Sequence, residues 1–116
     1  MFKRLYWAGY HGKFATVKWQ CNKLTPLPQP LTPAVFNLSE AKAYKDSAAF
    51  STYLTQLHGR FPDHRLHLLA HSQGNALVGE ALARSGVPVD TYVVTQGALP
   101  NSAYDVNAVT NADIAA

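Results

Sequence analysis

The stretch that decides the fold is Arg65-Leu66-His67-Leu68-Leu69-Ala70-His71-Ser72-Gln73-Gly74-Asn75. Residues 65–70 form an almost continuous apolar run, which is typical of a strand buried on both faces, as in a parallel sheet. Residues 75–85 are mostly small or apolar, and Gly86 and Pro88 follow them, so we expect a helix that ends there. The stretch therefore predicts a strand, a tight turn and a helix in direct succession.

Outside this stretch, strands and helices are predicted to alternate. Residues 14–19 are rich in β-forming residues and residues 91–95 are a second apolar run, so both are interpreted as strands. A helix is predicted over residues 38–58, because apolar residues recur there at every third or fourth position and Gly59 follows. Residues 25–33 hold four of the seven prolines and are expected to form an extended loop; a proline-rich ligand for a partner domain is the alternative.

The predicted order is strand, loop, helix, strand, helix, strand, which is that of an α/β fold with a parallel sheet and flanking helices. The chain has 116 residues, of which 47% are hydrophobic, so we expect one domain over residues 1–116 with a buried core. Three strands are too few to close a doubly wound sheet, so this domain is predicted to be partial. Its open sheet edges need a cover, which either further chain or a second copy in a homo-oligomer would supply.

The cysteine count and the apolar runs exclude several kinds of protein. Cys21 is the only cysteine, which excludes an internal disulfide and a cysteine-cluster metal site, and we expect no metal and no cofactor. The chain contains neither a recognisable secretory signal nor an apolar run long enough to cross a bilayer. We therefore expect a cytoplasmic protein without an integral membrane segment.

Positive charge gathers early in the chain, whose net charge is +3. No acidic residue precedes Glu40. The basic residues before it, with aromatic residues between them, are Lys3, Arg4, Lys13, Lys18 and Lys23. Such a segment is either a nucleic-acid surface or the solvated face of a strand. We expect no nucleic-acid partner, because no recognisable nucleic-acid-binding motif accompanies these charges.

Ser72 lies where a nucleophile elbow requires a serine, on the turn between a predicted strand and a predicted helix. A turn this sharp needs small residues two positions before and two positions after the serine, and these are Ala70 and Gly74. The backbone amide of Gln73, at the start of the helix, would point at a developing oxyanion. His71 is expected to pack beside the turn. The alternative is an ordinary turn in which the serine caps the helix.

The block Ala70-His71-Ser72-Gln73-Gly74-Asn75 resembles the elbow of the α/β-hydrolase family, in particular that of its esterase- and lipase-like bacterial members. The resemblance covers roughly residues 14–105, and its specific part is the elbow alone. It implies an incomplete α/β-hydrolase core in which Ser72 accepts the acyl group of a small carboxylic ester and Gln73 contributes an oxyanion amide. Asp105, in the loop after the last predicted strand, would correspond to the triad acid of some members; a solvated loop aspartate is the alternative.

The triad histidine of that family has no equivalent in this chain. The triad of this fold follows the chain in the order serine, acid, histidine, but all five histidines precede Ser72. They are His11, His58, His64, His67 and His71. Only His11, in a glycine-flanked loop, is considered for an approach to the site. The family's His-Gly oxyanion segment is also absent. Two hypotheses follow, an ester hydrolase that is inactive or weak as this chain stands, and a non-catalytic α/β binding or interaction module.

Overall fold

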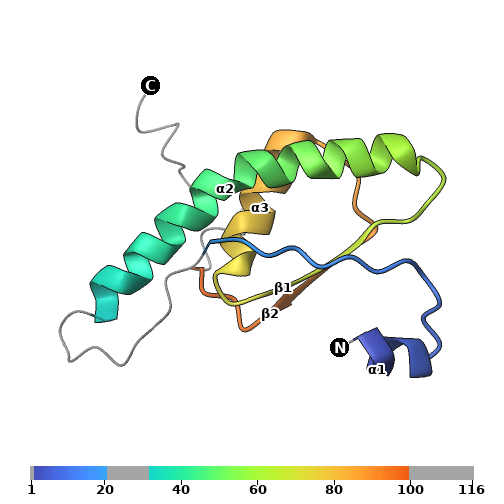
Figure 1. Ribbon diagram of the computed structural model, residues 1–116, viewed down its shortest axis with the longest axis horizontal. Helices are drawn as coiled ribbons and strands as arrows, with labels where there is room; N and C mark the ends of the chain where they lie inside the picture. The colour runs from blue at the N-terminus through green and yellow to red at the C-terminus, as the bar shows by residue number, and fades with distance from the viewer. Residues whose placement is uncertain (1, 21–31, 100–116) are drawn as a thin grey trace, which may run out of the picture.

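The structure is a computed structural model that describes residues 2–20 and 32–99. Its sheet consists of two parallel strands, β1 (His67–His71) and β2 (Thr91–Thr95). The two strands pair in register from the first residue of each to the last. Helix α3 (Gly74–Ser85) connects them, as Figure 1 shows. This strand–helix–strand unit confirms the predicted α/β fold with a parallel sheet and flanking helices.

The core of the protein lies between the sheet and its two long helices. Helix α2 (Thr32–Arg60) packs across α3 on one side of the sheet (Figure 1). The buried apolar side chains are Ala43, Phe50 and Leu54 of α2, Ala70 of β1, and Ala76, Leu77, Val78 and Ala81 of α3. The spacing of three or four residues that predicted α2 is therefore the spacing of its buried face.

Helix α2 is longer than the helix predicted over residues 38–58. It begins at Thr32, because Pro33 then falls in the first turn, where a backbone N–H has no partner within the helix. The end of the loop predicted over residues 25–33 is thus helical, and its other residues lie outside the described part of the chain. Gly59 does not end the helix, which continues to Arg60.

The strand predicted over residues 14–19 is not present. This segment is in no helix or strand; Phe14 at its start packs on the rings of Phe2 and Tyr10, and its other end contacts the core. The side chain of Trp19 packs against the core, and the backbone N–H of Gln20 donates a hydrogen bond of 3.2 Å to Oδ2 of Asp46. Alternating apolar residues predict one buried side, but here only Trp19 is half-buried and residues 14–18 are exposed. The sheet of the described residues therefore has two strands, where three were expected.

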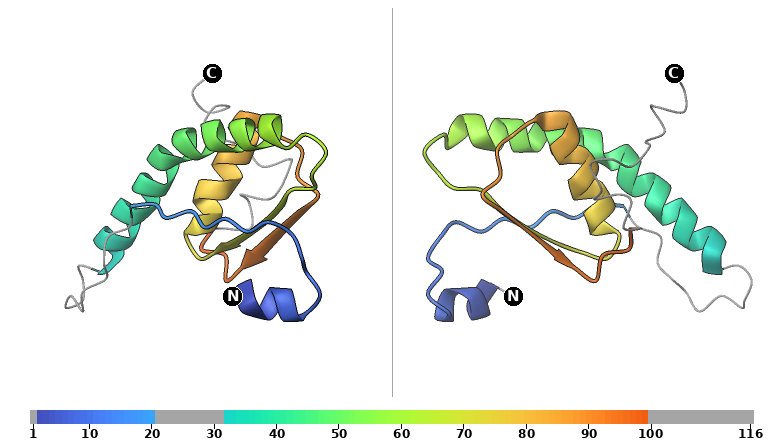
Figure 2. Two further views of the ribbon diagram at one scale, coloured as in Figure 1. Left: turned by 45° about the vertical axis from the view of Figure 1, so that its right-hand side comes forward. Right: turned by 180° about the vertical axis from the view of Figure 1, so that it is seen from behind.

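The prediction that β1 is buried on both faces is also wrong for the described residues. Ala70 faces the helices and is buried, but Leu69 and Val93, which pair across the sheet, are 45% and 41% exposed on the other face. Helix α1 (Phe2–Trp7) lies on that side of the sheet (Figure 2), but none of its residues is buried. An apolar run is compatible with one covered face or two, and here the described helices of the core cover one.

Candidate active site

Ser72 occupies a sharp turn between the end of β1 and the start of α3. Its φ is +52°, in the left-handed region that costs a non-glycine residue about 1–3 kcal/mol. Two backbone hydrogen bonds hold the turn in place. The N–H of Ser72 donates to the carbonyl oxygen of Thr95 (3.0 Å), and the N–H of Asn75 donates to the carbonyl oxygen of Ser72 (3.1 Å). The turn therefore has the strained strand-to-helix geometry that the sequence predicted for Ser72.

The side chain of Ser72 is half-buried, and its Oγ makes no hydrogen bond to another described residue. Gly74 is the first residue of α3, and a Cβ placed there would lie 4.0 Å from Ala70 Cβ and 4.0 Å from Trp19 Nε1. An alanine would therefore fit at position 74, whereas the branches of a larger side chain would meet the indole of Trp19.

Gln73 places its backbone and its side chain in different directions. It is the N-cap residue of α3, with φ −64° and ψ −15°, and its side-chain Nε2 donates a hydrogen bond of 2.9 Å to the carbonyl oxygen of Phe36 on α2. The side chain is thus tied to α2, while the backbone amide lies at the positive end of the α3 dipole. The first turn of α3 contains no acidic residue, so nothing in that turn opposes a negative charge there.

Asn75 joins the carboxyl ends of the two strands, a role that the sequence did not reveal. Its side chain is fully buried, and Nδ2 donates to the carbonyl oxygens of Ser72 (2.8 Å) and Thr95 (3.4 Å). The hydroxyl of Tyr92 donates to Oδ1 of Asn75 (2.9 Å). Each polar group of the amide therefore has a partner, and the network fixes the carbonyl of Ser72. The only feature of the sequence that could have indicated this role is the position of Asn75, a polar residue directly after the turn in a predicted helix of mostly apolar residues.

Gln96 is a second residue that sequence reasoning missed. It follows β2 directly and has φ +43°, so each strand is followed by a non-glycine residue in the left-handed region. The Nε2–H of His71 donates to Oε1 of Gln96 at 2.6 Å. His71 is thus held beside the turn, as expected, by a partner from the neighbouring strand end. No pattern in the sequence marks a glutamine as a residue with positive φ.

The other four histidines do not lie at this end of the sheet. His67 begins β1, and its ring lies 6.0 Å from that of Tyr10. His11 is the next residue after Tyr10, and its own ring packs on Tyr6 at 4.8 Å. The alternative in which His11 approaches Ser72 is therefore wrong in this structure, because the loop lies at the amino end of β1.

The last two histidines, His58 and His64, line an open hollow of about 330 Å³ that also contains Asp90. Oδ2 of Asp90 accepts a hydrogen bond from the N–H of Leu66 (2.9 Å), directly before β1. This hollow is at the amino ends of the strands, so neither histidine faces Ser72. The predicted acid, Asp105, lies outside the described residues.

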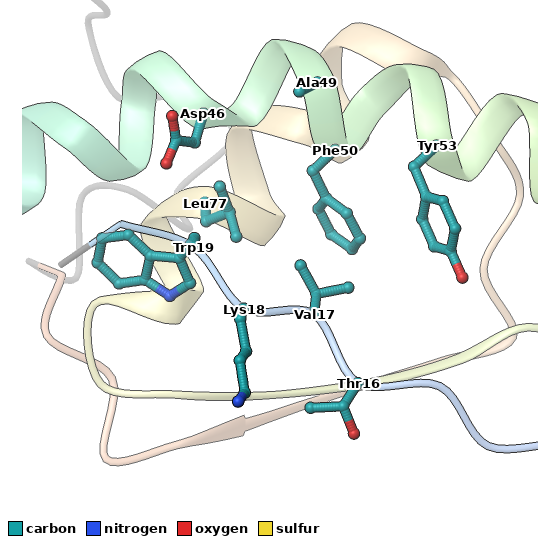
Figure 3. Close-up of a pocket in the computed structure, with 9 residues that line it drawn as sticks. All are labelled: Thr16, Val17, Lys18, Trp19, Asp46, Ala49, Phe50, Tyr53 and Leu77. Atoms are coloured by element: carbon teal, nitrogen blue, oxygen red, sulfur yellow. The ribbon is translucent and has the colours of Figure 1, made fainter.

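A groove lies between α2 and the extended segment of residues 16–19 (Figure 3). Its volume is about 410 Å³, and Val17, Phe50 and Leu77 give it apolar walls. Trp19 belongs both to this groove and to the surroundings of Gly74, so the groove begins close to the turn.

The described residues contain no helix that is long and apolar enough to span a membrane. Nor do they bring three histidine, cysteine, aspartate or glutamate side chains together as metal ligands.

A family model described as alpha/beta hydrolase matches residues 4–108, which is most of the chain. No curated protein and no solved structure matches significantly.

Proposed function

Because the chain belongs to the α/β-hydrolase family, we propose that it carries the nucleophile of a carboxylic-ester hydrolase of the esterase or lipase type, and that this nucleophile is Ser72. The observation that carries the proposal is the φ of +52° at Ser72, between a parallel strand and a helix. This backbone conformation is what a nucleophile elbow requires, and an ordinary helix-capping serine has no need of it.

The chemistry follows from the position of the turn. Oγ of Ser72 attacks the ester carbonyl and loses its proton to a base, and the carbonyl oxygen becomes an oxyanion. The amide of Gln73 donates to that oxyanion at the start of α3. Collapse of the tetrahedral intermediate expels the protonated alcohol and leaves an acyl-serine, which water then hydrolyses. The substrate is therefore a small carboxylic ester.

The base is the part of this mechanism that the chain does not supply. No histidine follows Ser72, and His71 already donates its Nε2–H to Gln96. We propose that Asp105 orients a histidine from outside this chain. Because the members of a triad act as a unit, the chain alone is expected to be inactive or weak.

Chemical rescue tests the assignment of Ser72. The purified chain should hydrolyse p-nitrophenyl acetate barely faster than buffer, and a fluorophosphonate probe should label it slowly or not at all. Added imidazole, which substitutes for the missing base, should raise a rate that disappears in Ser72→Ala. The rate of imidazole alone is subtracted, and Ser51→Ala on α2 is the matched control, which should keep the rescued rate.

Two results would contradict parts of this proposal. An imidazole-dependent rate that is equal in the chain and in Ser72→Ala would exclude Ser72 as the nucleophile. Strong turnover without imidazole that depends on Ser72 would show that the chain contains its own base, or that a second copy donates one.

We further propose that the chain is cytoplasmic and that it self-associates through the open face of its sheet. Leu69 and Val93 are exposed there, and parallel sheets are normally covered on both faces. A specific interface should bury on the order of 1,000 Å² or more. Analytical ultracentrifugation should therefore detect a species larger than the monomer at micromolar concentration, which Leu69→Lys should dissociate. A monomer throughout that range would contradict self-association.

A further inference from the structure

The first residues of the chain expose large apolar side chains. Helix α1 and the loop after it have six such residues between 36% and 79% exposed. We call them the N-terminal patch, and they are Phe2, Leu5, Tyr6, Trp7, Tyr10 and Phe14. Trp7, at 79%, is the most exposed of the six, which is unusual for the largest side chain of a small protein.

Ring contacts hold the patch together and attach it to the sheet. The ring of Phe14 lies 5.1 Å from that of Phe2 and 5.2 Å from that of Tyr10, and Tyr10 also contacts His67 at the start of β1. Helix α1, which carries four of the six residues, lies on the side of the sheet away from α2 (Figures 1 and 2). The patch is therefore an organised surface of the protein, at the end of β1 opposite Ser72.

Basic residues lie among these aromatic residues in the sequence. Lys3 and Arg4 lie within α1, and no acidic residue precedes Glu40 in the sequence. The ammonium group of Lys13 lies 4.2 Å from the centre of the Phe61 ring, a contact that leaves its charge unneutralised. An ion pair of the described residues, Arg84 with Glu80, lies elsewhere, on α3. Residues 2–14 thus combine exposed apolar side chains with three basic residues and no acidic one.

We propose that the N-terminal patch docks the protein on an anionic lipid surface. Exposed tryptophan, phenylalanine and leucine side chains enter the boundary between headgroups and acyl chains, and lysine and arginine beside them bind acidic headgroups. A second copy of the chain, which we propose to bind over Leu69 and Val93, is a poorer occupant of the N-terminal patch itself, because a symmetric contact through α1 would bring Lys3 and Arg4 of both copies together. The docking is independent of the chemistry at Ser72.

The two tryptophans make a direct test, because Trp7 belongs to the patch and Trp19 packs against the core. Trp19→Phe leaves Trp7 as the single reporter. When vesicles of phosphatidylcholine and phosphatidylglycerol are added, the fluorescence of Trp7 should shift to shorter wavelength and the protein should co-sediment with the vesicles. Vesicles of phosphatidylcholine alone should give neither result. Trp7→Phe is the matched control, in which the emission of Trp19 should stay unchanged.

Charge-reversal variants distinguish binding through the N-terminal patch from binding caused by the net charge of the whole protein. Arg4→Glu should lower partitioning onto the anionic vesicles by roughly tenfold or more. Lys45→Glu, at an exposed position of α2, changes the net charge equally and should have a much smaller effect. Absence of binding to anionic vesicles overturns the proposal, as does an equal loss in both variants. Self-association that depends on α1, without vesicle binding, would identify a second copy as the occupant.

Discussion

Replacing Leu54 with alanine is expected to lower the free energy of unfolding by about 3 kcal/mol, within the range of about 2–5 kcal/mol for a leucine removed from a core. Leu54 is 1% exposed and lies in the α2 face that packs on α3. The sheet of the described residues has only two strands, so contact between these two helices supplies much of the buried apolar surface. Loss of one side chain there removes packing that no other layer replaces.

Leu38→Ala is the matched control on the same helix, because Leu38 is 57% exposed. This substitution should lower the free energy of unfolding by less than about 1 kcal/mol. Urea denaturation followed by circular dichroism gives both values, provided that the denaturant dependence stays unchanged. If Leu54→Ala does not fold, Leu54→Val should give a graded loss of about 1 kcal/mol. Equal midpoints for the substitutions at the two positions would mean that α2 does not pack on α3 through Leu54.

The elements nearest the turn were the ones that local sequence patterns predicted well. The strand predicted over residues 91–95 is β2, and the helix predicted over residues 75–85 is α3 with one further residue at its start. β1 begins two residues later than predicted, because the backbone of Leu66 bonds with Asp90 before the ladder starts. Apolar runs bounded by glycine and proline give such elements clear limits.

The wrong predictions concern the segments that pack against residues 14–19 and residues 65–70 in the folded protein. Residues 14–19 have the composition of a strand, but a strand also needs a neighbouring edge, and composition does not say whether one is near. The apolar run at residues 65–70 likewise predicted two covered faces, although Leu69 is exposed. A local pattern records how apolar a segment is, and the partner that covers it is a property of the whole fold.

The candidate site divides in the same way. The sharp turn at Ser72 was predictable, because the sequence indicates a strand directly before it and a helix directly after it. Gln96 was not, because its positive φ follows from its place beside the turn of Ser72. Asn75 belongs to the block of residues 70–75 that resembles the family's elbow, but its three side-chain partners are in Ser72, Thr95 and Tyr92, and only folding brings these together.

Asn75→Ala is expected to destabilise the protein by about 2–4 kcal/mol, because it leaves a small cavity and removes one hydrogen-bond partner from each of three part-buried polar groups. These groups are the carbonyl oxygens of Ser72 and Thr95 and the hydroxyl of Tyr92. Asn37→Ala, at an exposed position of α2, is the control and should change stability by less than about 0.5 kcal/mol. Urea denaturation measures both.

Tyr92→Phe distinguishes a general packing effect from a specific effect on the turn. It removes the hydroxyl that bonds to Oδ1 of Asn75 but leaves the amide on the carbonyl of Ser72, so it should cost about 1 kcal/mol. If the amide of Asn75 positions the turn, Tyr92→Phe keeps most of the imidazole-rescued rate, whereas Asn75→Ala loses it even under conditions where it is fully folded. Equal rescued rates in the two folded variants would mean that the backbone hydrogen bonds alone hold Ser72 at its positive φ.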